Sequence, residues 1–203
     1  MDDYLLSANY LPPIKLTRKT GSEQFIEDGQ PIGVDLLAFW RWAFSDVLNN
    51  AQRGVLAEYI VASALGCNNG VRTQWDAYDL KTPTGVRVEV KSVAYLQSWG
   101  QEGFSKIKFS IAPAKVWNPQ TRKRSEAKTR AAQVYVFCVL STQDKDKVDP
   151  LDLDQWDFYC LNANILNEKV GAQREIVLKR LQSLGARQVK YHELAETVQS
   201  LLG

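Results

Sequence analysis

The stretch Val86–Leu96 alternates between apolar and polar side chains, and this pattern constrains the fold more than any other part of the chain. Residues two apart in a strand share a face. Burying Val88 and Val90 therefore sets the register of the strand and places Glu89 and Lys91 together on the opposite face. The sequence predicts a strand that presents an acid and a lysine side by side.

A second strand is predicted just before this one. The segment Thr73–Leu80 has strand character, and the turn residues 81–85 join it to the alternating stretch as a hairpin. With the turn centred near Pro83, Asp79 comes opposite or diagonal to Glu89, at roughly 5 to 8 Å. Two carboxylates at that separation repel unless a cation or a proton lies between them. The hairpin therefore predicts a site for a hard divalent cation with oxygen ligands.

A third carboxylate lies on a helix predicted upstream. Apolar residues recur at helical spacing from about Gln52 to Leu65, and Gly66 supplies the stop. Glu58 has mostly apolar neighbours on this helix, and isolated burial of a charge is costly. Two interpretations stay open for Glu58: a structural salt bridge, or service to a metal site.

The order of helix Glu58, strand Asp79 and then Glu89-Val90-Lys91 resembles the PD-(D/E)xK nuclease superfamily, which has the restriction-endonuclease-like fold. At the level of motifs the resemblance covers roughly residues 53–97. Tyr78 stands where the family pattern has proline. The resemblance implies metal-dependent hydrolysis of nucleic-acid phosphodiesters, with DNA favoured over RNA and with Mg²⁺, or alternatively Mn²⁺, as the cofactor.

The resemblance assigns roles to the residues of the hairpin, and the chemistry of their side chains is compatible with these roles. Asp79 and Glu89 would hold the metal together with the backbone carbonyl of Val90. A metal held in this way lowers the pKa of a bound water and neutralises charge on the phosphate. Lys91 would orient or help to deprotonate the attacking water and stabilise the transition state.

Two further residues complete the predicted site. Glu58 would hold a metal-bound water or a second ion, and Gln97, on the same strand face as Glu89, would contact the substrate or the attacking water. The Glu-x-Lys spacing alone is not specific, because Glu126-Ala127-Lys128 repeats it in a polar stretch without a strand signal. For Glu89 and Lys91 the alternative is a surface ion pair.

Basic residues gather just after the predicted hairpin. The formal net charge of the chain is only +2, so contact with nucleic acid would depend on a local cluster. Between residues 106 and 130 the only acid is Glu126, and Trp117 is interleaved. The group either grips a phosphate backbone or forms a solvated loop. Its predicted nucleic-acid-binding members are Lys106, Lys108, Lys115, Arg122, Lys123 and Arg124.

Other side chains exclude several kinds of site. The single histidine, His192, rules out a His-rich metal centre, so any metal would be held by carboxylates. Phe39, Trp40 and Trp42 fall at helical spacing, which favours core packing over base stacking. The three cysteines are scattered, which favours a reducing compartment. The N-terminus is acidic where a signal peptide would be basic, and no apolar run is long enough to cross a membrane. We therefore expect a cytoplasmic protein without a membrane partner.

The predicted elements indicate an α/β fold with a central mixed β-sheet of about five strands flanked by helices, restriction-endonuclease-like. We expect a single domain over residues 1–203, with an irregular N-terminal segment (1–32), a core (34–161) and C-terminal helices (170–203). The remaining predicted elements are a helix at 34–49, a strand at 106–111, a loop or short helix at 113–130, strands at 134–140 and 158–161, and helices at 175–184 and 192–202.

Three functions are consistent with these features. The first is a small metal-dependent nuclease, for which a homodimer would allow both strands of a duplex to be cut. The second is a non-catalytic nucleic-acid-binding or assembly module on the same fold. The third is a hydrolase or transferase of another phosphate ester.

Overall fold

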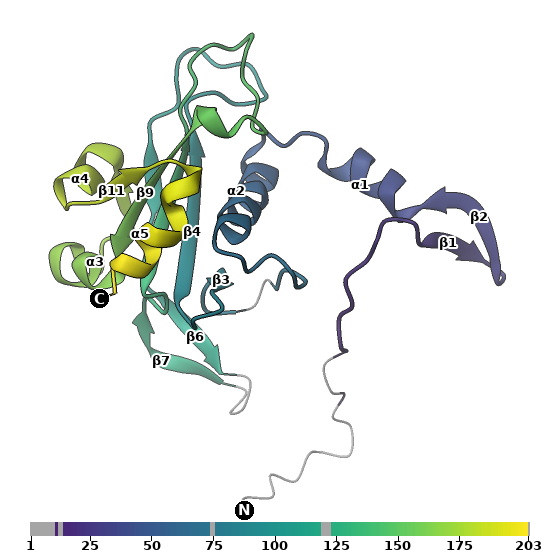
Figure 1. Cartoon of the computed structure of the whole chain (residues 1–203), viewed down its shortest axis with the longest axis horizontal. Helices are drawn as coiled ribbons and strands as arrows, with labels where there is room; N and C mark the ends of the chain where they lie inside the picture. Colours follow the sequence, from purple (N-terminus) through teal and green to yellow (C-terminus); the bar gives the residue numbers. More distant parts are fainter. Residues whose placement is uncertain (1–10, 12–13, 74–75, 119–122, 203) are drawn as a thin grey trace, which may run out of the picture.

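A five-stranded mixed sheet forms the centre of the computed structural model, which describes residues 11, 14–73, 76–118 and 123–202 (Figure 1). The strand order is β11-β9-β8-β4-β3, in which β4 and β8 run parallel and the other neighbours run antiparallel. This confirms the predicted α/β architecture. The strands are β3 (Leu80–Lys81), β4 (Arg87–Ala94), β8 (Val134–Leu140), β9 (Trp156–Asn162) and β11 (Arg187–Val189).

Helix α2 (Asn50–Ala64) covers one face of the sheet, together with the short helix η2 (Tyr191–Glu193) and α5 (Leu194–Ser200). The side chain of Asn49 accepts hydrogen bonds from the first free amides of α2, which is the usual way to begin a helix. The apolar face of α2 packs against Val88 and Val90, whose exposed fractions are 0% and 6%. The predicted helix at 52–65 and the predicted inward face of β4 are thus confirmed.

The other face of the sheet is covered by α3 (Ala163–Val170), α4 (Leu178–Ser183) and a small sheet of β5 (Lys108–Ser110) and β10 (Glu175–Val177). The predicted helix at 175–184 is therefore wrong in its first turn, because residues 175–177 pair with β5. The predicted strand at 106–111 exists but lies in this small sheet, and β11 takes the fifth place in the central one. Every residue of β8 is buried, as expected for a strand covered on both faces.

The prediction that residues 1–32 form an irregular segment is wrong in part. The N-terminal segment contains a hairpin of β1 (Gln24–Glu27) and β2 (Gln30–Asp35). Asp28 and Gly29 both have positive φ, 47° and 77°, which is the conformation of a type I′ hairpin turn. The Asp-Gly pair was the sequence signal for this hairpin.

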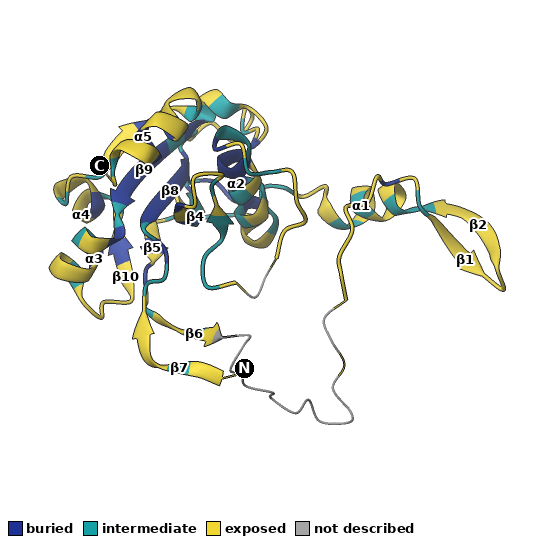
Figure 2. Cartoon of the chain, turned by 60° about the horizontal axis from the view of Figure 1, so that its bottom comes forward, coloured by how far each residue is buried: buried dark blue, intermediate teal, exposed yellow. Residues whose placement is uncertain are grey.

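Helix α1 (Leu36–Phe44) is shorter than the predicted helix at 34–49, and it contradicts the expectation of core packing. None of its residues is buried, and Trp42 is 85% exposed. The physical reason is that the β1–β2 hairpin and α1 project away from the central sheet, so the aromatic residues of α1 have no core to enter (Figure 2).

The segment predicted as a loop or short helix at 113–130 is instead a two-stranded ribbon. Strands β6 (Ala114–Asn118) and β7 (Lys123–Thr129) pair antiparallel and extend from the body (Figures 1 and 2). We call this ribbon, residues 114–118 and 123–129, the basic arm. In the part of the chain that the structure describes, no helix is long and apolar enough to cross a membrane.

Candidate active site

Asp79 lies at the edge of the central sheet, directly before β3. Its backbone amide donates to the carbonyl of Val88 at 3.1 Å, and its carboxylate Oδ2 accepts from the amide of Val90 at 2.7 Å. Of the predicted strand over 73–80, residues 74–75 lie outside the described residues, and the described strand β3 begins only at Leu80. On the N-terminal side of Leu80, the Asp79 side chain bonds the edge of β4. The amide and carbonyl of a strand residue point to the same edge, so the Val90 carbonyl also faces this side.

Glu89 and Lys91 lie on the face of β4 opposite Val88 and Val90, as the alternation predicts. The Lys91 ammonium donates to Glu89 Oε1 at 2.5 Å, and the exposed fractions of the two side chains are 29% and 19%. In the neighbouring parallel strand, Tyr135 aligns with Glu89. The acid and the lysine therefore form a partly shielded ion pair next to the sheet edge that carries Asp79.

The electrostatics of this edge are unbalanced. Burial raises the pKa of Asp79 from 3.8 to about 6, with a further contribution from the negative charge of Glu89. The Val90 amide and the Lys91 ammonium lower this pKa and offset only part of the effect. Burial and the charge of Glu89 also raise the pKa of Tyr135. The site thus carries more negative charge than its own residues neutralise.

Glu58 on α2 is held by a salt bridge. Arg72 donates through Nη2 to Glu58 Oε1 at 2.7 Å and through Nε to Oε2. This two-pronged contact raises the pKa of Arg72. The charge of Glu58 also makes the smallest of the contributions that raise the pKa of Asp79. Of the two interpretations that the sequence left open for Glu58, the structure shows the salt bridge. Glu58 also lies close enough to Asp79 for the two charges to interact.

A cavity of about 430 Å³ opens between α2 and the segment that leads into β3. Glu58, Arg72 and Asp79 form part of its wall, and Cys67 lies along the same wall. Among the described residues, Glu89 and Lys91 do not line this cavity. Asp79 therefore stands between the cavity on one side and the Glu89–Lys91 pair on the other.

The residues at this edge match the preferences of a hard cation. Asp79, Glu89 and the Val90 carbonyl offer only oxygen ligands, and Mg²⁺ is commonly held by one or two carboxylates while it keeps several waters. Within residues 11, 14–73, 76–118 and 123–202, no three His, Cys, Asp or Glu side chains are grouped closely enough to hold an ion by themselves. Water and substrate oxygens would have to complete the coordination.

Gln97 does not lie where the sequence predicted. Strand β4 ends at Ala94, and Gln97 is only 5% exposed, turned into the protein. Its Oε1 accepts from buried Arg53 at 3.1 Å, and its Nε2 donates to the Ala94 carbonyl and to Ser105 Oγ, both at 3.2 Å. The prediction of a strand-face position is wrong because the chain leaves the strand first, and the amide is needed to pair a buried guanidinium.

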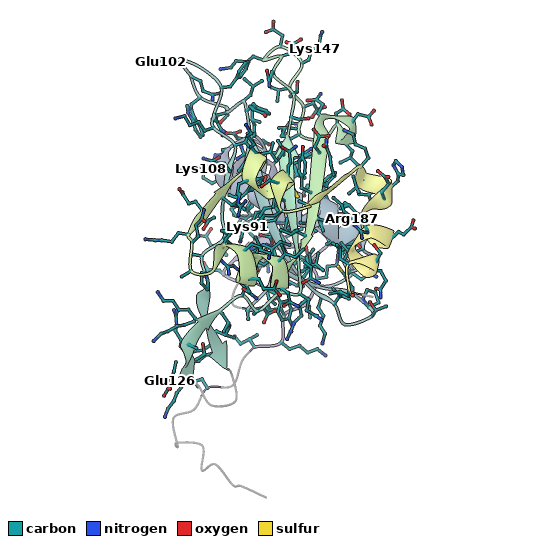
Figure 3. The ribbon with its side chains drawn as sticks, turned by 90° about the vertical axis from the view of Figure 1, so that its left-hand side faces the viewer. Lys91, Glu102, Lys108, Glu126, Lys147 and Arg187 are labelled. Atoms are coloured by element: carbon teal, nitrogen blue, oxygen red, sulfur yellow. The ribbon has the colours of Figure 1, made fainter. Side chains whose placement is uncertain are left out.

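The predicted nucleic-acid-binding residues separate into two regions. Lys106 and Lys108 lie at β5, where Lys108 pairs with Glu175 at 3.0 Å. Figure 3 shows Lys108 on the body and Glu126 out on the basic arm. Arg122 is outside the described residues. Lys115, Lys123 and Arg124 lie on the basic arm, together with Lys128.

Two acids and a lysine at the sheet edge of an α/β domain are the arrangement from which the sequence predicted a nuclease. The particular family follows from a comparison with known families: the family model for bacteriophage T4 endonuclease IV matches residues 42–174, and the chain belongs to this family. No curated protein matches the sequence. The match supports the predicted nuclease, while the resemblance to the PD-(D/E)xK superfamily stays a prediction.

The matched region contains α2, all of the predicted site residues and the basic arm. It begins inside α1 and ends before β10. The β1–β2 hairpin and all elements from β10 onward, including α4, η2 and α5, therefore lie outside the part of the chain that the family model covers.

Proposed function

We propose that this protein is a metal-dependent endonuclease that hydrolyses phosphodiester bonds of DNA, with Mg²⁺ as the natural cation and Mn²⁺ as a substitute. The observation that carries the proposal is the position of Asp79, whose carboxylate accepts from the Val90 amide and so meets Glu89 and Lys91 at one sheet edge. Two carboxylates held together in a shielded edge are costly without a cation, and a hard cation removes that cost. Membership of an endonuclease family supports the same activity.

In this proposal Asp79 and Glu89 hold the cation with the Val90 carbonyl, whose strand position is tied to Asp79 by the Val90 amide. When bound, the cation would lower the pKa of a coordinated water and neutralise charge on the phosphate. Lys91 is already within hydrogen-bond distance of Glu89, so its ammonium would lie next to the reacting phosphate. There it would orient the attacking water and stabilise the charge that develops on the phosphate oxygens.

We further propose that Glu58 orients a metal-bound water or holds a second ion. Its interaction with the charge of Asp79 supports this assignment. The competing contact is the Arg72 salt bridge, which engages both carboxylate oxygens of Glu58. Arg72 would have to move or share Glu58 when a cation is bound.

The direct test is cleavage of plasmid and oligonucleotide substrates with Mg²⁺, with Mn²⁺ and with a chelator. We expect cleavage only with a divalent cation, and loss of cleavage with retained DNA binding in Asp79→Asn and Lys91→Met. Glu102→Gln is the matched control, because Glu102 is an exposed acid at the end of the molecule away from Glu126 and the basic arm (Figure 3). Absence of cleavage of any DNA or RNA form, together with no calorimetric binding of either cation, would overturn the proposal.

A further inference from the structure

We propose that the basic arm is an exosite that binds the sugar-phosphate backbone of nucleic acid several nucleotides away from the cleaved bond. This inference rests on the proposed function in one respect only, namely that the protein cleaves a bond in the nucleic acid. The binding itself can be measured in a protein that does not cut. Four observations on the arm support it: its charge, its exposure, its preformed shape and its position.

The positive charges of the arm destabilise the ribbon that carries them. Lys115 lies directly opposite Lys128 across the ribbon. Like charges that face each other across a strand pair are destabilising. Lys123 and Arg124 add two more positive charges, against one described acid, Glu126. A polyanion that binds across the ribbon would relieve this repulsion.

The arm is exposed along its length and does not serve the core. Apart from Ser125, every described β7 residue from Lys123 to Thr129 is exposed. Isolated two-stranded ribbons are marginally stable in water. Trp117 lies opposite Arg124 and is 46% exposed, which leaves an aromatic surface for a sugar or a base beside a guanidinium.

The shape of the arm is nevertheless preformed. The strand register shifts between Lys115 and Trp117, and the hydroxyl of Ser125 holds this irregularity. Ser125 Oγ accepts from the Val116 amide at 2.9 Å and donates to the Ala127 carbonyl at 2.7 Å. A ribbon with a fixed bulge presents its charges in one arrangement.

The base of the arm is anchored to the body by Arg130. Its guanidinium donates to the Ile111 carbonyl at 2.9 Å, to the Asn167 side chain at 2.9 Å and to the Gly171 carbonyl at 2.8 Å. The chain then enters β8, where Val134 aligns with Val88 and Tyr135 with Glu89. The fixed end of the arm is therefore only a few residues from the strand that carries the acid and the lysine.

The free end of the arm extends well beyond this point. Figure 1 shows the arm at the end of the molecule where β3 lies. At about 3.3 Å per residue, the seven residues of β7 span roughly 23 Å. That length corresponds to roughly seven base pairs of duplex at about 3.4 Å each. A substrate only a few nucleotides long would therefore fill the active site without reaching the tip.

The test uses Asp79→Asn protein and fluorescein-labelled DNA, with anisotropy as the readout. The arm variant combines Lys115→Gln, Arg124→Gln and Lys128→Gln, and circular dichroism checks its folding. For single- and double-stranded DNA of about 24 nucleotides we expect affinity to fall about tenfold or more, and the salt slope to fall by about 2 to 3. For DNA of about 4 nucleotides we expect no change.

The matched control removes the same number of positive charges from the body. It combines Lys169→Gln, Lys179→Gln and Arg180→Gln, all exposed on α3 and α4. An equal loss of affinity in this control, or no loss in the arm variant, would overturn the exosite. Absence of cleavage by the wild type would overturn the proposed function, while the anisotropy result would still decide the exosite.

Discussion

Asp79 Oδ2 accepts a hydrogen bond of 2.7 Å from the backbone amide of Val90, the residue between Glu89 and Lys91. The first acid of the site is therefore tied to the strand that carries the second acid and the lysine. One oxygen of Asp79 is engaged by this bond, and the other is left for a cation or a proton. An arrangement held in place before the ligand arrives needs little reorganisation for binding.

Asp79→Asn should abolish cation-dependent cleavage and, at pH 8 without a divalent cation, stabilise the protein by about 3 kcal/mol. The amide of asparagine can still accept from Val90, while the charge that repels Glu89 is gone. Urea unfolding of both proteins at pH 8 measures the difference in the free energy of unfolding. A destabilised variant would contradict the assignment of strain to the Asp79 charge.

The stability gain should depend on pH in a defined direction. The pKa of Asp79 is raised by folding, from 3.8 to about 6, so folding favours the protonated acid. The stability that the wild type gains from protonated Asp79 is fully present below about pH 4 and is lost as the pH rises through about 6. The wild type and Asp79→Asn should therefore converge in urea midpoint near pH 4 and separate by pH 7. Parallel curves over this range would contradict the assignment.

Cation binding should weaken on the acidic side of the same titration. Below about pH 6 a cation has to displace the proton from Asp79, so affinity should fall about tenfold for each further pH unit. Titration calorimetry with Mn²⁺ at about pH 5, 6 and 7.5 measures this, and buffers of different ionisation enthalpy report the released proton. An affinity that is independent of pH in this range would remove Asp79 from the ligand set.

Lys91→Met should lower the rate of cleavage by about a hundredfold or more, while DNA affinity changes little. The reason is that Lys91 contributes a charge at the reacting phosphate, and its ion pair with Glu89 is partly solvated. Single-turnover rates and anisotropy separate the two effects. Equal losses in rate and in affinity would indicate that Lys91 serves ground-state binding instead.

Glu58 is tested against Arg72 by a double-mutant cycle. If Glu58 serves the cation or its water, Glu58→Gln lowers activity and the double variant with Arg72→Gln stays equally inactive. If Glu58 only balances Arg72, the double variant recovers both activity and stability. The salt bridge itself should contribute no more than about 1 kcal/mol, since both side chains retain contact with solvent.

The parts of the fold that the sequence predicts well are those in which one local pattern decides the outcome. Alternation at Val88 and Val90 gave the register of β4, and the continuous apolar run of β8 gave a strand buried on both faces. In both cases burial within the central sheet favours the same structure as the local sequence pattern. The structure of these strands can therefore be predicted without knowing which distant residues pack against them.

The errors fall where distant packing decides. Residues 175–177 form a strand because β5 offers them an edge, which the helical pattern of that segment does not reveal. The aromatic spacing of α1 suggested a buried helix, yet burial depends on where the β1–β2 hairpin carries it. Gln97 was placed by counting along the strand, and the count fails where the strand ends at Ala94.

The cavity beside Asp79 also gives the protein a built-in chemical reporter. Cys138 and Cys160 are sealed in the sheet, whereas Cys67 is half-buried on the cavity wall, and burial raises the pKa of its thiol. Alkylation of the native chain should therefore be slow and confined to one position. The rate of that single modification would register, without any engineered label, whether the cavity is filled.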